Sequence, residues 1–361
     1  MNVSTLIESG STSNEVSQRP FDPFTPPAPS TPPADAAAVG STQPTFAALR
    51  AHLQTRIIGQ PHLVDSLLTA LLAAGHLMVE GAPGLAKTTA IKELAAVLQG
   101  DFRRLQFTPD LLPGDLTGTD VYRPASGNFE FQRGPLFHNL ILADEINRAP
   151  AKVQAALLEA MGEHQISVGG TTYALPSPFL VMATQNPIEH EGTYPLPEAQ
   201  LDRFLLYVRI GHPDAAAEHA ILKLARRQAA GLDSASTDRP QRVTQAQVRA
   251  ARHEVLALHM GEAVEAYVVQ LVLATRDPAR HDPALVRRLA YGASPRATIA
   301  LDRCARAHAW LQGRDFVSPD DVQAVAPDVL RHRIGVSFEA EAEGIDADAI
   351  VSALLQRVPV A

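Results

Sequence analysis

A lysine and a threonine stand at the end of a glycine-rich segment whose surroundings suit the binding of phosphate. The segment follows an apolar run at 76–80 and reads Gly81-Ala82-Pro83-Gly84-Leu85-Ala86-Lys87-Thr88-Thr89. A helical pattern begins at Lys87. Glycines let backbone amides surround phosphate oxygens, and a helix N-terminus adds partial positive charge. We therefore expect this segment to bind a nucleotide, with Lys87 reaching the β- and γ-phosphates and Thr88 binding magnesium.

The segment departs from the strict phosphate-loop pattern at one position. Ala86 stands where a glycine normally precedes the lysine. Alanine fits there if the residue already has helical dihedral angles. A degenerate match can also arise by chance in a chain rich in Ala and Gly, so the interpretation depends on further residues.

Two adjacent carboxylates, Asp144 and Glu145, follow a second apolar run at 140–143. Consecutive side chains of a strand point in opposite directions, so we expect the two carboxylates to have different roles. Asp144 would hold magnesium, and Glu145 would orient and deprotonate the attacking water. An isolated Asp-Glu pair is often a solvated strand end, but the phosphate-binding segment upstream favours the catalytic interpretation.

A third apolar run, at 181–184, leads into Gln185, Asn186 and Pro187. By itself, Asn-Pro indicates a turn. Together with the other two groups, Asn186 is expected to hold the lytic water opposite Glu145. The three groups predict a site that hydrolyses a nucleoside triphosphate.

Strands must position these residues, and apolar runs do alternate with helical patterns from residue 45 to residue 211. This alternation predicts an α/β fold with a parallel sheet covered by helices on both faces. We expect strands at 76–80, 103–107, 139–143 and 178–184, and helices at 61–74, 87–98 and 150–161.

The rest of the chain has a different character. After residue 212 only helices are expected, because apolar residues recur at helical spacing at 255–260, 264–275 and 297–311. We predict an α/β nucleotide-binding domain at 44–211 and a helical lid domain at 212–361, with a loop at 231–240. Eight of the 28 prolines lie before Thr45, which predicts a disordered tail at 1–43.

Composition limits the class of partner and the compartment. The formal net charge of −8 argues against a general nucleic-acid binder, which needs basic surface to displace counterions from phosphates. The single cysteine, Cys304, excludes an internal disulfide and favours a reducing compartment. Because no apolar segment is long enough to span a bilayer, we expect a soluble, cytoplasmic protein without a membrane partner.

The chain resembles the MoxR branch of the AAA+ ATPases from about residue 46 to residue 334. The segments that carry the resemblance are GAPGLAKT at 81–88, FTPDLLP at 107–113, DEINRA at 144–149, GTYPLPEAQLDRF at 192–204 and GASPRA at 292–297. Ala86 before the lysine is typical of this branch. The resemblance implies ATP and Mg²⁺ as cofactors and a homo-oligomeric ring, expected to be a hexamer.

Further residue roles follow from the resemblance. Arg203 resembles the arginine finger that enters the ATP site of a neighbouring subunit, and Arg296 resembles the sensor that reports the γ-phosphate to the lid. Asn186 resembles the first sensor, and Ile58 and Gly59 lie in the segment that lines the adenine pocket. Outside this context, Arg203 pairing with Asp202 or Glu198, and Arg296 at a helix start, would be ordinary surface features.

The resemblance also suggests the work that hydrolysis drives. The segment 108–118 and a predicted hairpin at 165–174 correspond to insertions that project toward the pore of the ring. We expect a chaperone-like remodeller that acts with a von Willebrand factor A (VWA) domain partner in maturation, or in metal or cofactor insertion, of a client enzyme. The motor subunit of a metal chelatase and a nucleotide-dependent scaffold with little turnover remain alternatives, and a helicase is the least favoured.

Overall fold

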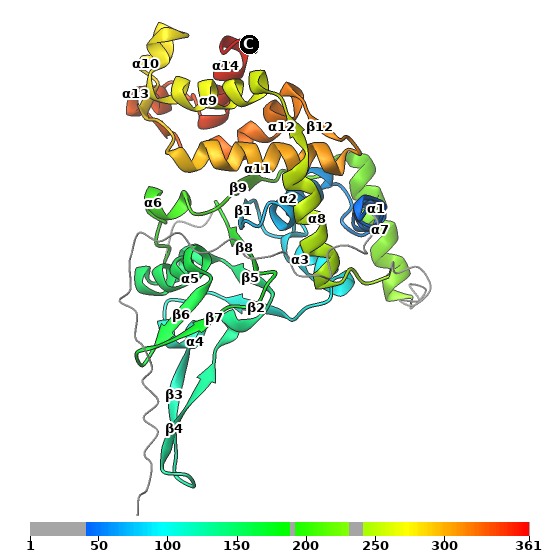
Figure 1. Ribbon diagram of the computed structural model, residues 1–361, viewed down its shortest axis with the longest axis vertical. Helices are drawn as coiled ribbons and strands as arrows, with labels where there is room; N and C mark the ends of the chain where they lie inside the picture. The colour runs from blue at the N-terminus through cyan, green and yellow to red at the C-terminus, as the bar shows by residue number, and fades with distance from the viewer. Residues whose placement is uncertain (1–40, 188–191, 231–240, 361) are drawn as a thin grey trace, which may run out of the picture. The chain divides into compact units, whose positions relative to one another are not determined.

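A five-stranded parallel sheet lies at the centre of the protein (Figure 1). The computed structural model describes residues 41–187, 192–230 and 241–360. The strand order is β2-β5-β8-β1-β9, and every neighbouring pair is parallel. The strands are β1 (Leu77–Glu80), β2 (Phe102–Gln106), β5 (Leu140–Asp144), β8 (Leu180–Gln185) and β9 (Leu206–Arg209). The carboxyl ends of all five strands therefore meet at one edge of the sheet.

The strands β1, β5, β8 and β9 are buried, whereas the edge strand β2 is largely exposed. Side chains of a strand alternate between its faces. On β1, Leu77 and Val79 join one hydrophobic core, whereas Met78 joins a second core on the other face. The first core includes side chains of α2 (Pro61–Leu72) and α3 (Lys87–Val97), and the second includes side chains of α5 (Ala151–Glu163).

Several elements surround this sheet before residue 212. The helix α1 (Gln43–Arg56) packs against α2 and α3. The shorter elements are α4 (Pro113–Thr117), η2 (Pro135–Phe137), η3 (Ile146–Arg148) and α6 (Glu198–Leu201).

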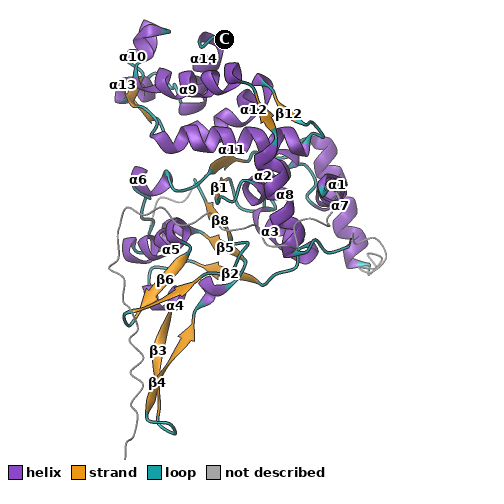
Figure 2. Cartoon of the chain, viewed as in Figure 1, coloured by secondary structure: helices purple, strands orange, loops and turns teal. Residues whose placement is uncertain are grey.

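Two antiparallel hairpins extend from the sheet region (Figure 2). The hairpin predicted at 165–174 is confirmed as β6 (Gln165–Val168) and β7 (Thr171–Ala174). Its turn needs the two glycines, since Gly169 and Gly170 have φ values of 59° and 81°. The second hairpin, β3 (Gly118–Arg123) and β4 (Asn128–Arg133), was not predicted from the sequence. Most of its side chains are exposed, although Phe129 and Phe131 alternate with polar residues on β4.

The chain after residue 212 is mainly helical. Its helices are α7 (Ala215–Ala229), α8 (Gln245–Ala257), α9 (Glu262–Arg276), η4 (Pro278–Arg280), α10 (Pro283–Val286), α11 (Pro295–Leu311), α12 (Pro319–Leu330), α13 (Phe338–Ala342) and α14 (Ala347–Arg357). The expectation of helices alone is wrong, because β10 (His259–Met260) pairs with β12 (Phe316–Val317) and β11 (Leu289–Tyr291) pairs with β13 (Gly335–Val336). Strands of two or three residues are too short to show an alternating pattern.

The helices α8 and α11 pack against α2, so the helical region and the sheet region share one core. The boundary near residue 212 stays a prediction. The predicted loop at 231–240 and residues 1–40 of the predicted tail lie outside the described residues, and α1 begins at Gln43. Among the described residues, no helix has the length and apolar character that crossing a membrane requires.

Candidate functional site

The glycine-rich segment forms the connection between β1 and α3. Lys87 is the first residue of α3, and its Nζ donates to the carbonyl of Gly81 at 2.5 Å and to that of Gln185 at 3.4 Å. The ammonium group therefore lies between the loop after β1 and the end of β8. This is the position from which it can reach the phosphates of a nucleotide bound in the loop.

Ala86 does not have the right-handed helical dihedral angles that were the condition for alanine to fit before Lys87. Its φ is 61° and its ψ is 14°, which is the left-handed region. The loop must turn sharply into α3, and a left-handed residue makes that turn. Glycine adopts this conformation without strain, so the alanine carries a conformational cost that glycine would avoid.

Asp144, the last residue of β5, is held by partners on both carboxylate oxygens. The Thr184 hydroxyl donates to Oδ1 at 2.6 Å, and Arg104 donates to Oδ2 from Nη2 at 2.7 Å and from Nε at 3.0 Å. The Thr184 hydroxyl also accepts from the backbone N–H of Glu145 at 3.0 Å. One threonine on β8 thus fixes both the buried aspartate and the backbone of the glutamate that follows it.

Glu145 lies beyond the strand, with φ 57° and ψ 51°, so the alternation of strand side chains does not govern it. Its Oε2 accepts from Gln106 Nε2 at 2.8 Å and lies 3.3 Å from Arg148 Nε. Gln106 and Arg104 are two residues apart on β2 and therefore share one face. The expectation that Asp144 and Glu145 point in opposite directions is wrong, because both reach this face of β2.

Asn186 follows β8 directly and is buried. In the sheet, β8 lies between β5 and β1. Asn186 therefore begins its loop between the strand that ends at Asp144 and the strand that leads into Gly81.

The segment expected to line an adenine pocket packs against the chain that follows β9. Gly59 has a φ of 80°, and a Cβ at this position would lie 2.9 Å from Pro213 Cβ. Gln60 Nε2 donates to the carbonyl of Gly211 at 2.8 Å. Ile58, which directly precedes these two residues, is half-buried.

Arg203 lies before β9, at the amino edge of the sheet. The parallel register of β1 with β9 pairs Leu77 with Leu206, so Arg203 and the loop after Glu80 lie at opposite edges, separated by a strand length of roughly 10 Å. The Nη1 of Arg203 donates to the carbonyl of Leu158 at 3.1 Å. The structure therefore does not bring Arg203 to the phosphate loop of its own chain.

Arg296 lies at the same amino edge. Its Nη1 is 3.7 Å from Oδ2 of Asp202, the residue before Arg203, and Ser294 Oγ donates to the same oxygen at 2.9 Å. Arg333 donates from Nε to Asp202 Oδ1 at 2.9 Å, and burial lowers the pKa of Arg333 while Asp202 opposes that shift. Asp202, one of the two acids considered as an ordinary partner of Arg203, contacts Arg296 and Arg333 instead.

The chain is similar to known proteins along most of its length. A model of the ATPase family associated with various cellular activities matches residues 76–206, and a model of the AAA lid domain matches residues 286–354. "Chaperone MoxR1" of Mycobacterium tuberculosis is 46% identical over 84% of this chain and 78% of its own. "Protein MoxR" of Methylorubrum extorquens is 33% identical over 84% of this chain and 91% of its own. The chain belongs to the MoxR family of AAA+ ATPases.

A solved structure agrees with this assignment. The crystal structure of a protein from Cytophaga hutchinsonii, described as a "putative ATPase", matches this chain with a TM-score of 0.79 and 43% sequence identity. The match covers 88% of this chain and 97% of the Cytophaga chain. The MoxR-family chain is therefore an ATP-hydrolysing enzyme with the predicted α/β fold and an AAA lid.

Three residues of this MoxR-family site are not identified by its sequence motifs: Arg104, Gln106 and Thr184. Each contacts Asp144 or Glu145 only because β2 and β8 flank β5 in the sheet. Two of the three, Arg104 and Gln106, leave a signal in the sequence as polar residues two apart on one strand, but that signal does not say which strand lies beside it.

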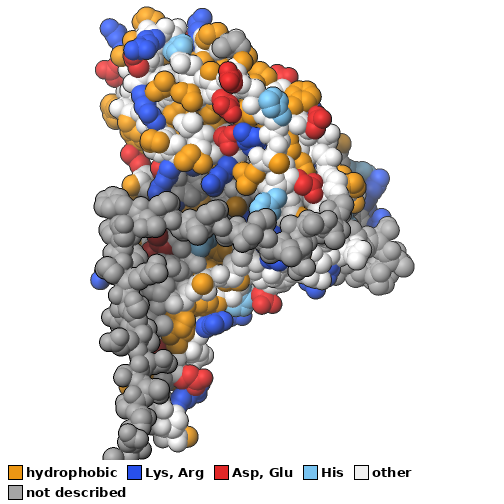
Figure 3. All heavy atoms as spheres, viewed as in Figure 1, with side chains coloured by type: hydrophobic (Ala, Val, Ile, Leu, Met, Phe, Trp, Pro, Cys, Tyr) orange, Lys and Arg blue, Asp and Glu red, His pale blue; other side chains and the backbone are white. Residues whose placement is uncertain are grey.

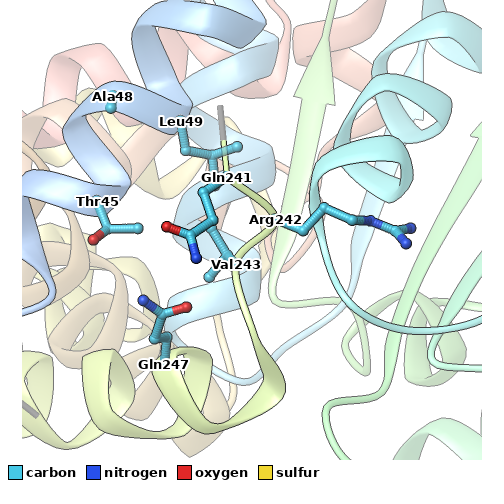
Figure 4. Close-up of a pocket in the computed structure, with 7 residues that line it drawn as sticks. All are labelled: Thr45, Ala48, Leu49, Gln241, Arg242, Val243 and Gln247. Atoms are coloured by element: carbon cyan, nitrogen blue, oxygen red, sulfur yellow. The ribbon is translucent and has the colours of Figure 1, made fainter. Parts of the chain in front are cut away.

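The rest of the described surface of this MoxR-family chain shows no second group of the predicted site residues. On the face shown in Figure 3, basic and acidic side chains of the described residues are interspersed. A pocket between α1, α8 and the segment before α8 contains none of the predicted site residues (Figure 4). Its lining residues are Thr45, Ala48, Leu49, Gln241, Arg242, Val243 and Gln247.

Proposed function

We propose that this chain uses Mg²⁺ and ATP bound at the carboxyl edge of β1, β8 and β5 to drive the remodelling of a client protein. The observation that carries the proposal is the Thr184 hydroxyl, which joins Asp144 to the backbone of Glu145 beside the lysine of the phosphate loop. Asp144 is buried and Glu145 is partly exposed, and their side chains have different partners, which suits one for metal binding and the other for proton transfer.

The donor groups on the chain fit a magnesium nucleotide. The loop at 81–88 would bind the phosphates through backbone N–H groups, and Lys87 would turn from the Gly81 carbonyl toward them. The Thr88 hydroxyl and the Asp144 carboxylate supply the oxygen ligands that magnesium prefers. The metal, when bound, would neutralise charge that develops on the terminal phosphates.

Glu145 would act as the base in hydrolysis. Its carboxylate would accept a proton from the attacking water, and the Asn186 amide would orient that water from the neighbouring strand end. Arg148 and Gln106 now contact the Glu145 carboxylate, so Glu145 must exchange at least the contact with Gln106 for the water.

The site would be completed by a second copy of the chain. Arg203 and Arg296 both lie at the amino edge of the sheet, where neither can reach the ATP of its own loop. A guanidinium fork binds developing charge on phosphoryl oxygens, so both arginines suit action on a neighbouring subunit's ATP. This arrangement supports a ring, for which we propose a hexamer, with Arg296 acting in trans.

Two substitutions test the assignment of the site. Lys87→Ala should abolish hydrolysis by weakening nucleotide binding, whereas Glu145→Gln should abolish hydrolysis but keep ATP bound. Filter binding of labelled ATP and release of phosphate separate the two effects. ATPase activity that survives both substitutions would contradict the proposal.

The two hairpins are the proposed client-contacting surface. They touch each other, because Phe131 on β4 stacks on Tyr173 on β7 with ring centroids 4.2 Å apart. At the free part of the longer hairpin, Tyr122 and Phe129 are 52% and 72% exposed and contact each other. Exposed aromatic rings offer contact area for a partner protein.

A VWA-domain protein and a client enzyme are the proposed partners, and the name of the 46%-identical relative favours a chaperone over a chelatase subunit. Purified Glu145→Gln held in ATP should retain the VWA protein and the client, and Lys87→Ala should release them. If the chain were instead a scaffold that binds ATP with little turnover, Glu145→Gln would support the biological process as well as the wild type does. Recovery of the same partners with both variants would contradict nucleotide-dependent remodelling.

A further inference from the structure

Arg104 joins the two carboxylates of the site through a single glutamine. Its Nη2 donates to Asp144 Oδ2 at 2.7 Å and also to Gln106 Oε1 at 2.9 Å. Gln106 in turn donates from Nε2 to Glu145 Oε2 at 2.8 Å. The metal-binding acid and the proposed base are thus the two ends of one hydrogen-bonded chain.

The hydrogen bonds of this series can run in only one direction from donor to acceptor. A guanidinium has donors and no acceptor, so the amide atom of Gln106 that faces Arg104 must be Oε1. The amide nitrogen of Gln106 then faces Glu145, whose carboxylate can only accept hydrogen bonds. Arg104 therefore dictates the orientation in which Gln106 binds the base.

Arg104 also occupies the oxygen of Asp144 that a metal would need. Thr184 takes Oδ1, and Arg104 directs two N–H groups at Oδ2. The Asp144 side chain is only 11% exposed, whereas that of Arg104 is 47% exposed and can swing into solvent. A cation that approaches Asp144 must therefore compete with the Arg104 guanidinium, which can be displaced into solvent.

We propose that Arg104 is a positioning residue that competes with magnesium for Asp144 and, while it is bound there, fixes the orientation of the Gln106 amide. This inference rests on the proposed function of Asp144 and Glu145. Once Arg104 leaves Asp144, Gln106 loses the partner that fixes its amide. The magnesium concentration that the site needs is thereby set in part by Arg104.

The direct test is the metal dependence of nucleotide binding, which does not require turnover. Fluorescent ADP is titrated with Mg²⁺ in the wild type, in Arg104→Met and in Arg103→Met, a matched control on the adjacent, exposed strand position. The magnesium concentration at half-maximal signal should fall about two- to fivefold in Arg104→Met, as expected for loss of a half-exposed ion pair. It should stay unchanged in Arg103→Met. Equal midpoints in the two variants, or a higher one in Arg104→Met, would overturn the proposal.

A second variant tests whether the positive charge carries the competition. Arg104→Lys keeps a cation near Asp144 but lacks the planar fork that serves Asp144 and Gln106 together. It should keep a magnesium midpoint near that of the wild type. A midpoint that falls as far as in Arg104→Met would contradict the competition.

Failure of this inference can be told apart from failure of the proposed function. Thermal unfolding of each variant establishes that it is folded, and Arg104→Gln replaces Arg104→Met if the latter is not. The proposed function fails if Lys87→Ala and Glu145→Gln still hydrolyse ATP, whatever the magnesium midpoints are. The role of Arg104 fails on the midpoints alone, even when both of those variants are inactive.

Discussion

The guanidinium of Arg203 lies directly against Gly162 near the end of α5. A Cβ at this glycine would be 2.3 Å from Arg203 Nη1, so the absence of a side chain at Gly162 makes room for the arginine. The same Nη1 donates to the carbonyl of Leu158. The proposed finger is therefore held in place by a helix of its own subunit.

Substituting Gly162→Ala should disturb catalysis without harming the fold. Alanine favours a helix over glycine by about 1 kcal/mol, and the only atoms in its way belong to a flexible side chain. Arg203 must move, and a misplaced catalytic group lowers kcat by on the order of ten- to a hundredfold. Steady-state ATPase assays and thermal unfolding check both effects.

Gly114→Ala on α4 is the matched control, because a Cβ there meets nothing within 4 Å. It should leave kcat unchanged. A Gly162→Ala variant with normal kcat, or with a lower melting temperature, would contradict the role given to this contact.

Removing the Thr184 hydroxyl should affect both stability and turnover. Thr184→Val keeps the shape but leaves the Asp144 carboxylate and the Glu145 N–H without this partner, which costs about 1–3 kcal/mol in the free energy of unfolding. Urea unfolding should show that loss, and kcat should fall with it. Thr119→Val, at an exposed position of β3, is the control and should change neither quantity.

Ala86 offers a test of the loop geometry. Ala86→Gly removes a left-handed alanine, whose conformation costs about 1–2 kcal/mol, but it also adds about 0.4–1 kcal/mol of chain entropy to the unfolded state. The free energy of unfolding should stay constant or rise by up to about 1.5 kcal/mol, with nucleotide affinity retained. Ala86→Val should lower both, since a β-branched residue is strained at positive φ. Greater stability of the valine variant in urea unfolding would argue against this geometry.

His76, which leads into β1, predicts a pH dependence of stability. Burial lowers the pKa of His76 to about 3, and its ring accepts from the Val181 N–H and contacts the Met161 carbonyl. The unfolded chain takes up this proton near pH 6.5 and the folded chain does not, so the free energy of unfolding falls as pH falls below about 6.5. The contribution of His76 approaches about 1.4 kcal/mol per pH unit.

Urea unfolding at pH 7, 6 and 5 measures this slope. His76→Gln keeps a donor and an acceptor but does not titrate, so it should show a shallower loss of stability at acidic pH. His219→Gln, at an exposed histidine, should keep the wild-type slope. Identical slopes in all three proteins would show that His76 is not the group responsible.

The parts of the site that the sequence predicts are those that lie close together along the chain. The loop from Gly81 to Thr88 sits between a strand and a helix as expected, and Asp144 ends a buried strand. The residues that contact Asp144 and Glu145 from β2 and β8 could not be predicted, because a single sequence does not specify the order of strands in a sheet. The direction of Glu145 was mispredicted because one left-handed residue ends the strand and breaks its alternation.

The fold also has parts that the sequence predicts and parts that it does not. The strands β1, β2, β5 and β8 were placed to within a few residues, whereas the short buried strand β9 was not predicted. The Gly169-Gly170 turn identified its hairpin. The longer hairpin, β3–β4, carries mostly exposed side chains, so it lacks the continuous apolar run that identifies a buried strand. Where a segment's conformation depends on surroundings other than the core, local sequence holds little information about it.

Mixing two inactive variants tests most directly whether ATP is hydrolysed at a site shared between subunits. Lys87→Ala lacks the phosphate-binding lysine but keeps Arg203, whereas Arg203→Ala keeps the loop but lacks the finger, whose loss costs on the order of 10³-fold or more in kcat. In an equimolar mixture, about a quarter of the subunit contacts would join an intact loop to an intact Arg203. We predict that the mixture regains ATPase activity toward that fraction of the wild-type rate. A mixture no more active than the two variants measured separately would contradict the shared site.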